Sequence, residues 1–262
     1  MTGTPSGKTA DFMITPQEWH RRFVQQARWT EEIRRFIIQQ IRLTNFQRIL
    51  ETGCGTGAIL NSMQHLLPAT NFYGIDLRMD YLEAARLYAP KSHLAAADAA
   101  GLPAADATFD AVICHYFLLW IKDPASILNE MKRVTRPGGL VIALAEPDYG
   151  GRIDYPASLV ELGHLQGRAL QSQGADPNMG RKLSALFHQA GLSNIHTGLL
   201  GGQWNEVPSF EAWESEWAVL QTDLGPAIDK DRLDALRSLD AAAWQKGERI
   251  LFVPTFYAWG RV

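Results

Sequence analysis

Short apolar runs alternate with amphipathic stretches through the middle of the chain. The strand-like runs cover residues 46–52, 71–77, 92–98, 109–117 and 139–147. Between them, residues 58–67, 80–89 and 125–135 repeat their apolar side chains at the spacing of a helix that buries one face. A proline follows each of these stretches closely and would end the helix. Strands separated by helices of about ten residues predict βαβ units with right-handed crossovers, and therefore a parallel sheet.

A different pattern precedes the first strand, over residues 15–41. One face at helical spacing holds Trp19, Phe23, Ile33 and Ile37, which predicts one amphipathic helix. The same face also carries Arg22, Gln26 and Thr30, with Trp29 at its border. Polar groups within an apolar stripe need partners when they are buried. They would find them either in neighbouring backbone or in a ligand over which the helix forms a lid.

Further helices and strands are expected beyond residue 147. The helices cover residues 158–174, 209–224 and 231–247, and a helix followed by the start of a strand covers residues 178–195. A last strand covers the end of the chain from residue 250, where Pro254 indicates an edge position or a bulge.

These elements predict a single domain over residues 15–262, preceded by a polar and disordered lead-in of residues 1–14. Residues 46–147 form its core. Residues 148–175 and 203–247 are helical insertions that we expect on the ligand side of the sheet. Both insertions are rich in aromatic and apolar side chains, which are typical of the walls of small-ligand pockets.

Composition and charge narrow the classes of partner. The chain has 262 residues, of which 46% are hydrophobic and 20% charged, as in soluble globular proteins. The net charge of -3, without a block of like charges, argues against a nucleic acid as the main partner. The two cysteines, Cys54 and Cys114, lack metal-ligand spacing, so we expect no metal site, no disulfide framework and a cytoplasmic location. No apolar run is long enough to span a membrane, so no membrane partner is expected.

The segment "RILETGCGTGAIL", residues 48–60, places three alternating glycines directly after the first strand, where a helix begins. Ligands of open α/β sheets bind beyond the carboxyl ends of the strands. Glycine lets the backbone turn sharply there and lets a ligand approach closely. The segment therefore predicts a ligand-binding loop. The alternative is a tight turn that only packs the strand against the helix.

Acidic residues stand at three neighbouring strand ends. Glu51 lies just before the first glycine, Asp76 ends the second strand and Asp98 ends the third. A carboxylate in the position of Asp76 is able to accept both hydroxyls of a ribose. Each acid alone also fits a helix cap or a turn. Together they predict a nucleoside site.

The spacing of Gly53, Gly55 and Ala58 also fits G-x-G-x-x-A, the dinucleotide fingerprint. A nicotinamide-dependent oxidoreductase therefore stays open at this point. Such an enzyme would place the pyrophosphate of its cofactor on the helix N-terminus. A nucleoside without phosphates needs only the glycine backbone and the acids.

Four segments extend this pattern: "LETGCGTG", "GIDL", "ADAAGLPAADATFDAVICHYFLLWIKDP" and "MKRVTRPGG". In order and spacing, residues 46–147 resemble the motif series of class I S-adenosylmethionine-dependent methyltransferases. More narrowly, they resemble the small-molecule group that includes the ubiquinone/menaquinone-type enzymes. The resemblance implies a Rossmann-like sheet of seven strands, mostly parallel, with helices on both faces and the last strand antiparallel. It implies S-adenosyl-L-methionine as the cofactor and S-adenosyl-L-homocysteine as the product.

The resemblance also implies roles for single residues, carried over by position. Backbone around Gly53, Cys54 and Gly55 would hold the methionine part of the cofactor, beside Glu51, which replaces the Asp of many relatives. Asp76 would take the ribose hydroxyls, Leu77 would lie beside the adenine, and Asp98 and Ala99 would bond it. Cys114 and His115 would touch the centre of the cofactor. The lid would add Arg22, near the methionine carboxylate, together with Gln26, Trp29 and Thr30.

The reaction expected is in-line attack on the sulfonium methyl group by an O, N, C or S atom of a small, partly apolar acceptor. His115 and Tyr149 are the candidate catalytic residues, with Glu146, Asp148 and His164 as further possible bases. The polar contacts to the acceptor are predicted at Tyr149, Arg152 and His164. Asp98 and the motifs after it disfavour the oxidoreductase. A non-catalytic protein that binds the cofactor or its product remains the other alternative, and we expect a monomer or a homodimer.

Overall fold

The computed structural model of the chain describes residues 15–202, 207–225 and 228–262. The lead-in of residues 1–14, expected to be disordered, lies outside the described residues. The central sheet contains β1 (Arg48–Thr52), β2 (Asn71–Asp76), β3 (His93–Ala96), β4 (Phe109–His115), β5 (Thr135–Pro147), β7 (Ser193–Leu199) and β9 (Thr255–Arg261). Its order is β3-β2-β1-β4-β5-β9-β7, and β9 runs antiparallel to both of its neighbours. The predicted seven-stranded, mostly parallel sheet is therefore confirmed.

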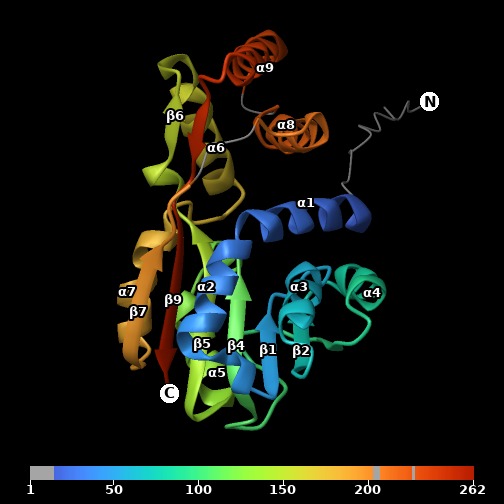
Figure 1. The fold of residues 1–262 in the computed structure, drawn as a ribbon, viewed down its shortest axis with the longest axis vertical. Coiled ribbons are helices and arrows are strands. Elements are labelled where there is room, and N and C mark those ends of the chain that lie inside the picture. Colours follow the sequence, from blue (N-terminus) through green and yellow to red (C-terminus); the bar gives the residue numbers. More distant parts are fainter. Residues whose placement is uncertain (1–14, 203–206, 226–227) are drawn as a thin grey trace, which may run out of the picture.

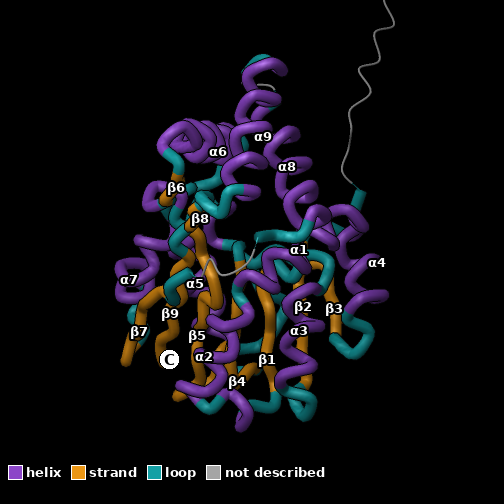
Figure 2. The backbone as a smooth tube through the Cα atoms, turned by 45° about the horizontal axis from the view of Figure 1, so that its top comes forward, coloured by secondary structure: helices purple, strands orange, loops and turns teal. Residues whose placement is uncertain are grey.

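Helices cover both faces of this sheet. One face carries α2 (Glu31–Ile41), α3 (Ala58–Leu66) and α4 (Met79–Tyr88), and the other carries α5 (Pro124–Val134) and α7 (Met179–Gln189). Figure 2 shows α2 and α3 in front of the strands. Because side chains alternate along a strand, Ile49 and Ile113 pack under the first group, whereas Leu50 and Val112 pack under the second. Two apolar layers thus fix the sheet between the helices.

The strand order reverses next to β1, which is the point where open α/β sheets bind ligands. The chain first runs outward from β1 through β2 to β3, and β4 then pairs with the other side of β1. The parallel register brings the ends of β1, β2, β4 and β5 to one edge. The glycine loop leaves β1 at this edge.

A second layer of structure, here called the cap, lies beyond these carboxyl ends (Figure 1). It consists of α6 (Val160–Ser172), α8 (Phe210–Leu224), α9 (Lys230–Gln245) and the two-stranded antiparallel sheet of β6 (Ile153–Tyr155) and β8 (Ile250–Phe252). Its own apolar core includes Leu162, Trp217 and Leu236. The cap therefore has a core distinct from the two layers around the sheet.

The final strand predicted from residue 250 is two strands. Pro254 lies between β8 in the cap and β9 in the central sheet, and its carbonyl accepts a hydrogen bond of 2.8 Å from the Asp148 backbone. Since β9 is flanked by β5 and β7, Pro254 does not mark a sheet edge. It marks the place where the chain passes from one sheet to the other.

The single helix expected over residues 15–41 is also divided, into α1 (Pro16–Trp29) and α2. Thr15 and Glu18 form a capping box that starts α1. At Thr30 the backbone departs from helical geometry (φ -107°, ψ 12°), and the side chain bonds the Gln26 carbonyl at 3.0 Å. Figure 1 shows α1 lying across the strand ends, between the core and the cap. The break at Thr30 allows this change of direction.

Short 3-10 helices complete the described elements, at Leu43–Asn45, Leu118–Trp120, Tyr149–Gly151 and Ala157–Leu159. None of the helices within the described residues is long and apolar enough to cross a membrane.

Candidate functional site

The glycine loop after β1 adopts backbone conformations that other residues avoid. Gly53, Gly55 and Gly57 have φ values of 68°, 51° and 80°, in the left-handed region. A side chain on Gly53 would also overlap the ring of Phe117, which packs against the loop. The Cys54 backbone N–H binds the carbonyl of Ile75 at 2.9 Å and so fastens the loop to β2. The loop is therefore a fixed turn, and the rings of Phe117 and Phe23 pack against Gly53 and Gly55.

Asp76, at the end of β2, holds the glycine loop from the other side. Its Oδ2 atom accepts a hydrogen bond of 2.8 Å from the Gly55 backbone, and its Oδ1 atom accepts one of 2.9 Å from the Arg78 backbone. A carboxylate offers about four acceptor positions, so each oxygen keeps capacity for another donor. The adjacent Leu77 side chain is 69% exposed. This arrangement fits a vicinal diol at Asp76 with a flat apolar ring beside it.

Asp98 and Ala99 lie in the turn that follows β3, at the same edge of the sheet. Asp98 is exposed, and its Oδ1 atom accepts a hydrogen bond of 2.9 Å from the Ala100 backbone. Ala99 is buried in the core beneath the turn. The Asp98 carboxylate therefore caps a turn and still offers its second oxygen to a ligand.

At the end of β4, both predicted contact residues are buried. Burial raises the pKa of the Cys114 thiol, and it does the same for Cys54, so both thiols are neutral packing groups. Burial lowers the pKa of His115, with Arg34 adding to the effect. His115 is therefore a neutral imidazole, and its Nε2 atom lies 2.8 Å from the Thr30 hydroxyl. The end of β4 thus contacts the end of the lid helix directly.

Two carboxylates that sequence reasoning offers as bases are engaged elsewhere. Glu146, at the end of β5, accepts hydrogen bonds from the backbone of residues 117, 118 and 119 at 2.9, 2.9 and 3.2 Å. Burial raises the pKa of Glu146 to about 7, although these bonds act in the opposite direction. Asp148 binds the Arg181 guanidinium through both oxygens, at 2.5 and 2.7 Å. Both groups hold loops beside the strand ends in place.

The lid helix α1 contacts the glycine loop on one side and the cap on the other. The ring of Phe23 lies against Gly55, and His20 Nδ1 is 2.8 Å from the Thr56 hydroxyl. On the opposite side, the buried Arg22 forms an ion pair with Glu216 of α8, and Gln25 donates to a backbone carbonyl of the same helix at 3.2 Å. Contacts from α1 thus join the glycine loop to the cap.

Arg22, expected near the methionine carboxylate, lies here among groups of the cap and the strand ends. Its guanidinium stacks 4.8 Å from the Trp29 ring and acts electrostatically on Tyr149 and Tyr116. Burial disfavours its charge, but Glu216 more than compensates, so the pKa of Arg22 is raised. A permanent positive charge is therefore enclosed beside the ends of β4 and β5.

The three residues predicted to contact the acceptor lie in different places. Tyr149 follows β5 near Arg22, and burial raises its pKa, so the phenol is neutral. Arg152 is bound to Asp154 at 2.6 Å and also to Gln166, inside the cap. His164 is exposed on α6. Tyr149 lies near Arg22 at the strand ends, and the charge of Arg152 also acts on Tyr149, although the Arg152 guanidinium is paired inside the cap.

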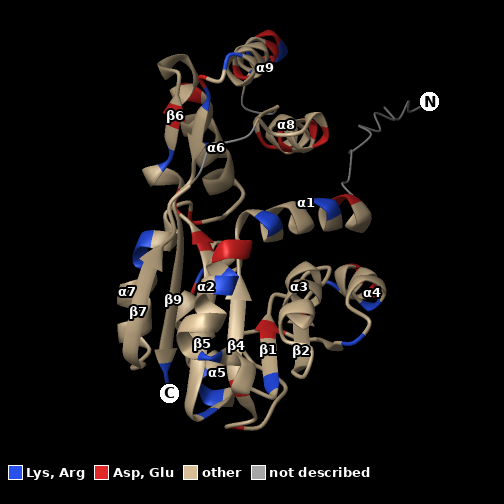
Figure 3. Ribbon diagram, viewed as in Figure 1, with Lys and Arg blue, Asp and Glu red and all other residues tan. Residues whose placement is uncertain are grey.

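Sequence reasoning missed Glu216 as a member of this region. The only signal is the charge of α8, which carries four acidic residues and no Lys or Arg (Figure 3). Nothing in the spacing of the sequence indicates which of them meets α1, since the two helices are far apart in the chain. The contact is decided by how the cap sits over the sheet.

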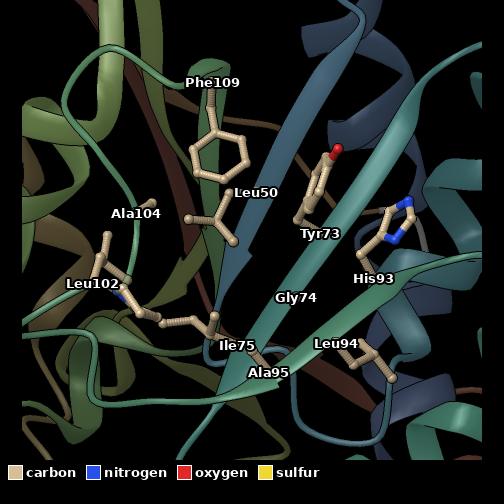
Figure 4. A pocket seen from close by; sticks show the side chains of 11 residues that line it. Leu50, Tyr73, Gly74, Ile75, His93, Leu94, Ala95, Leu102, Ala104 and Phe109 are labelled. Carbon is tan, nitrogen blue, oxygen red and sulfur yellow. The ribbon is translucent and has the colours of Figure 1, made fainter.

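A separate hollow of about 160 Å³ lies on the face of β1, β2 and β3 that α3 does not cover (Figure 4). Its walls are largely apolar and are formed by Leu50, Tyr73, Gly74, Ile75, His93, Leu94, Ala95, Leu102, Pro103, Ala104 and Phe109. None of the predicted cofactor residues is among them. We therefore assign the functional site to the strand ends and not to this hollow.

Comparisons with known proteins address the strands and the glycine loop that form the candidate site. Residues 50–143 match the family model described as "Methyltransferase domain". An uncharacterized methyltransferase of Schizosaccharomyces pombe is 29% identical over 228 residues, which is 80% of this chain and 81% of the relative. The ubiquinone/menaquinone biosynthesis C-methyltransferase UbiE of Desulfotalea psychrophila is 28% identical over 205 residues, 69% of this chain and 80% of the relative.

A solved structure shares the fold. It is phosphoethanolamine N-methyltransferase 2 of Haemonchus contortus in complex with phosphomonomethylethanolamine and S-adenosylhomocysteine, with a TM-score of 0.56 and 17% identity. The match covers 91% of this chain and 57% of that chain. This likeness shows the fold alone, whereas the family match and the methyltransferase relatives decide between the alternatives for the glycine loop.

The chain belongs to the class I S-adenosylmethionine-dependent methyltransferases. Its cofactor is S-adenosylmethionine, and the nicotinamide-dependent oxidoreductase is set aside. Three features of the structure of this methyltransferase are compatible with the cofactor: the left-handed glycine turn after β1, the spare acceptor positions of Asp76 and the exposed Leu77 beside them.

Proposed function

We propose that this methyltransferase acts on a small, partly apolar acceptor at the place where β4, β5, α1 and α8 meet. The observation that carries this proposal is the double contact of α1, with the glycine loop below it and with the cap above it. A helix and a cap that cover the strand ends obstruct a nucleic-acid strand, which favours a small acceptor. The absence of a basic block in the sequence supports the same choice.

The residues proposed to hold the cofactor follow the edge of the sheet. The backbone of the glycine loop, with Glu51 beside it, would receive the methionine part, while Asp76 and Leu77 would receive the ribose and the adenine. Asp98 and Ala99 would contact the far side of the adenine. Its central part would meet Cys114 and His115, and the lid residues Arg22, Gln26, Trp29 and Thr30 would lie over the methionine end.

When bound, the cofactor supplies an electrophilic methyl group for in-line attack by an O, N, C or S atom of the acceptor. The protein accelerates this step mainly by fixing the two reacting atoms at near-attack distance and excluding water. Tyr149 and His115 are both neutral where they lie. We therefore propose that Tyr149 orients the acceptor by hydrogen bonding, and that His115 lines the site as a neutral group and as the candidate acceptor of a proton.

The test is a transfer assay with S-adenosylmethionine labelled in the methyl group. The purified protein is incubated with a library of small hydroxylated, amino and carbanion-forming acceptors, and in parallel with tRNA and DNA. The proposal expects label in a small molecule, and at most background label in nucleic acid. The variant Tyr149→Phe is compared with the wild type in the same assay. It keeps the ring but loses the hydroxyl, so kcat/KM should fall by about tenfold or more, the cost of one lost hydrogen bond.

Label transferred to tRNA or DNA and not to any small molecule would contradict the proposal. Cofactor binding without transfer to any acceptor class would favour a non-catalytic binding protein instead.

A further inference from the structure

A buried polar cluster lies behind the glycine loop, on the side away from the cap. Its centre is Arg34 of α2, which is 1% exposed. One guanidinium nitrogen donates to the Thr30 hydroxyl at 2.8 Å, and the other donates to the Ser62 hydroxyl at 3.0 Å. Since Thr30 also lies 2.8 Å from His115, the guanidinium is one hydrogen bond away from the end of β4. The cluster joins α2, α3 and the strand that ends at the methyl-transfer site.

Two atoms of this cluster lack a hydrogen-bond partner among the described residues: Arg34 Nε and Glu51 Oε2. Glu51 is only 2% exposed. A buried polar atom without a hydrogen-bond partner costs free energy, so each of these two atoms calls for an explanation. The two side chains do not form an ion pair within 4.0 Å, yet their charges act on one another.

Glu51 and the Thr30 partner of Arg34 both lie next to elements of the cofactor site. Glu51 is the second-to-last residue of β1 before the glycine loop, and Thr30 is the hinge between the lid helix α1 and α2. We propose that Arg34 is a positioning residue for the cofactor: it holds the Thr30 hinge against His115 and supplies the positive charge that faces the Glu51 carboxylate. The roles proposed above for the cofactor-binding residues do not involve Arg34.

The charges around Glu51 determine what this guanidinium does. Burial raises the pKa of Glu51 to about 8, Arg34 lowers it, and Asp76 of β2 raises it. The Leu60 backbone also lowers it, while the Cys54 and Cys114 thiols nearby are neutral, as is His115. Burial lowers the pKa of Arg34 to about 10. The charges of Glu31 and Glu51 raise this pKa, whereas the charge of Arg35 lowers it further. Arg34 is thus the cation that favours an ionised Glu51.

An ionised Glu51 beside the glycine loop attracts the ammonium group of a ligand more strongly than a protonated Glu51 does. S-adenosylmethionine and S-adenosylhomocysteine both carry an ammonium group on their methionine part. Cofactor affinity should therefore fall as the pH drops below about 8, where Glu51 takes up a proton. Removal of the Arg34 charge raises the pKa of Glu51, so this fall should begin at a higher pH.

The experiment is calorimetric titration of S-adenosylhomocysteine into the full-length protein between about pH 6 and 10. Arg34→Gln removes the charge but keeps a hydrogen-bond donor, and Arg34→Lys keeps the charge. Arg35→Gln is the matched control, because Arg35 pairs with Glu31 at the surface of the same helix. The amino group of the ligand titrates identically in every variant, so differences between the profiles report the protein.

We expect the acid limb of the profile to move up by about one pH unit or more in Arg34→Gln, and to stay in place in Arg34→Lys and Arg35→Gln. Amide exchange across residues 26–34 should also become faster in Arg34→Gln, since a single, shorter amide group does not bridge the Thr30 and Ser62 hydroxyls as the guanidinium does. A folded Arg34→Gln protein whose profile coincides with that of the wild type would overturn the proposal. Should Arg34→Gln not fold, Glu51→Gln decides: loss of the acid limb supports the proposal, and an unchanged limb overturns it.

Discussion

At the scale of single residues, the cofactor site is built from groups that also hold the backbone. Asp76 is the clearest case, because the same carboxylate receives the Gly55 and Arg78 backbone and keeps free acceptor positions. A structural role for an acidic residue at a strand end, as a turn or cap residue, is therefore compatible with a role in ligand binding. One side chain performs both tasks at this edge of the sheet.

Asp76→Ala should weaken the binding of S-adenosylhomocysteine by about 1–3 kcal/mol, the cost of leaving polar partners unsatisfied. Isothermal titration calorimetry measures this directly. Asp80→Ala serves as the control, since Asp80 forms an exposed ion pair with Arg78 one turn further on. Equal affinities of Asp76→Ala and the wild type would remove Asp76 from the cofactor site.

At the scale of elements, α1 is the part whose role depends most on its neighbours. Its contacts with α8 are polar, through Arg22, Gln25 and Ser215, and not through an apolar seam. Polar contacts at an interface open at less cost than an apolar core does, because water replaces the lost partners. This favours a lid that moves when the cofactor enters.

Cofactor binding should increase the hydrogen-exchange protection of α1, and Glu216→Ala should lower that protection in the absence of cofactor. The reason is that Arg22 loses its carboxylate partner while α1 keeps its contacts with the glycine loop. Glu214→Ala is the control, because Glu214 pairs with Arg237 inside the cap. Identical exchange of α1 with and without cofactor would make it a fixed scaffold.

At the scale of the whole molecule, the cap has its own core and its own buried ion pairs. Arg249 is fully buried and binds Asp154 and Asp240 at 2.7 Å each, while Asp240 also accepts from Trp213 and Trp217 at 2.7 and 3.0 Å. These contacts join β6, α8, α9 and the start of β8. The cap is therefore held together independently of the cofactor-binding sheet.

Arg249→Met should destabilise the cap by about 3–5 kcal/mol, because it removes the ion-pair partner of the buried Asp240 and one of the two arginines that bind Asp154. Limited proteolysis should then cleave the cap first, and methyl transfer should be lost while S-adenosylhomocysteine still binds the core. Arg232→Ala, which breaks an exposed ion pair with Glu161, is the control and should leave all three properties unchanged. Loss of cofactor binding in parallel with transfer would show that cap and core fold as one unit.

Local pattern in the sequence is enough to predict the sheet, its helices and the cofactor edge. Strand and helix periods differ, glycine is required where φ is positive, and parallel strands bring their carboxyl ends to one edge. Gly53, Gly55 and Asp76 lie at the strand ends that chain position predicts, and Asp98 lies in the turn after β3, while their roles toward the cofactor stay predictions. Each depends on its own strand and on the turn that follows it.

Only the tertiary structure decides the contacts between elements that are distant in the chain. It divides the expected helix at Thr30, joins Arg22 to Glu216 across 194 positions, and pairs Arg152 with Asp154 and Gln166 in the cap. It also buries Arg34 and Glu51 within electrostatic reach of one another. Such pairings depend on how whole layers pack, and no periodicity records them, because a side chain's burial and partner are properties of the assembled surfaces and not of its neighbours in the sequence.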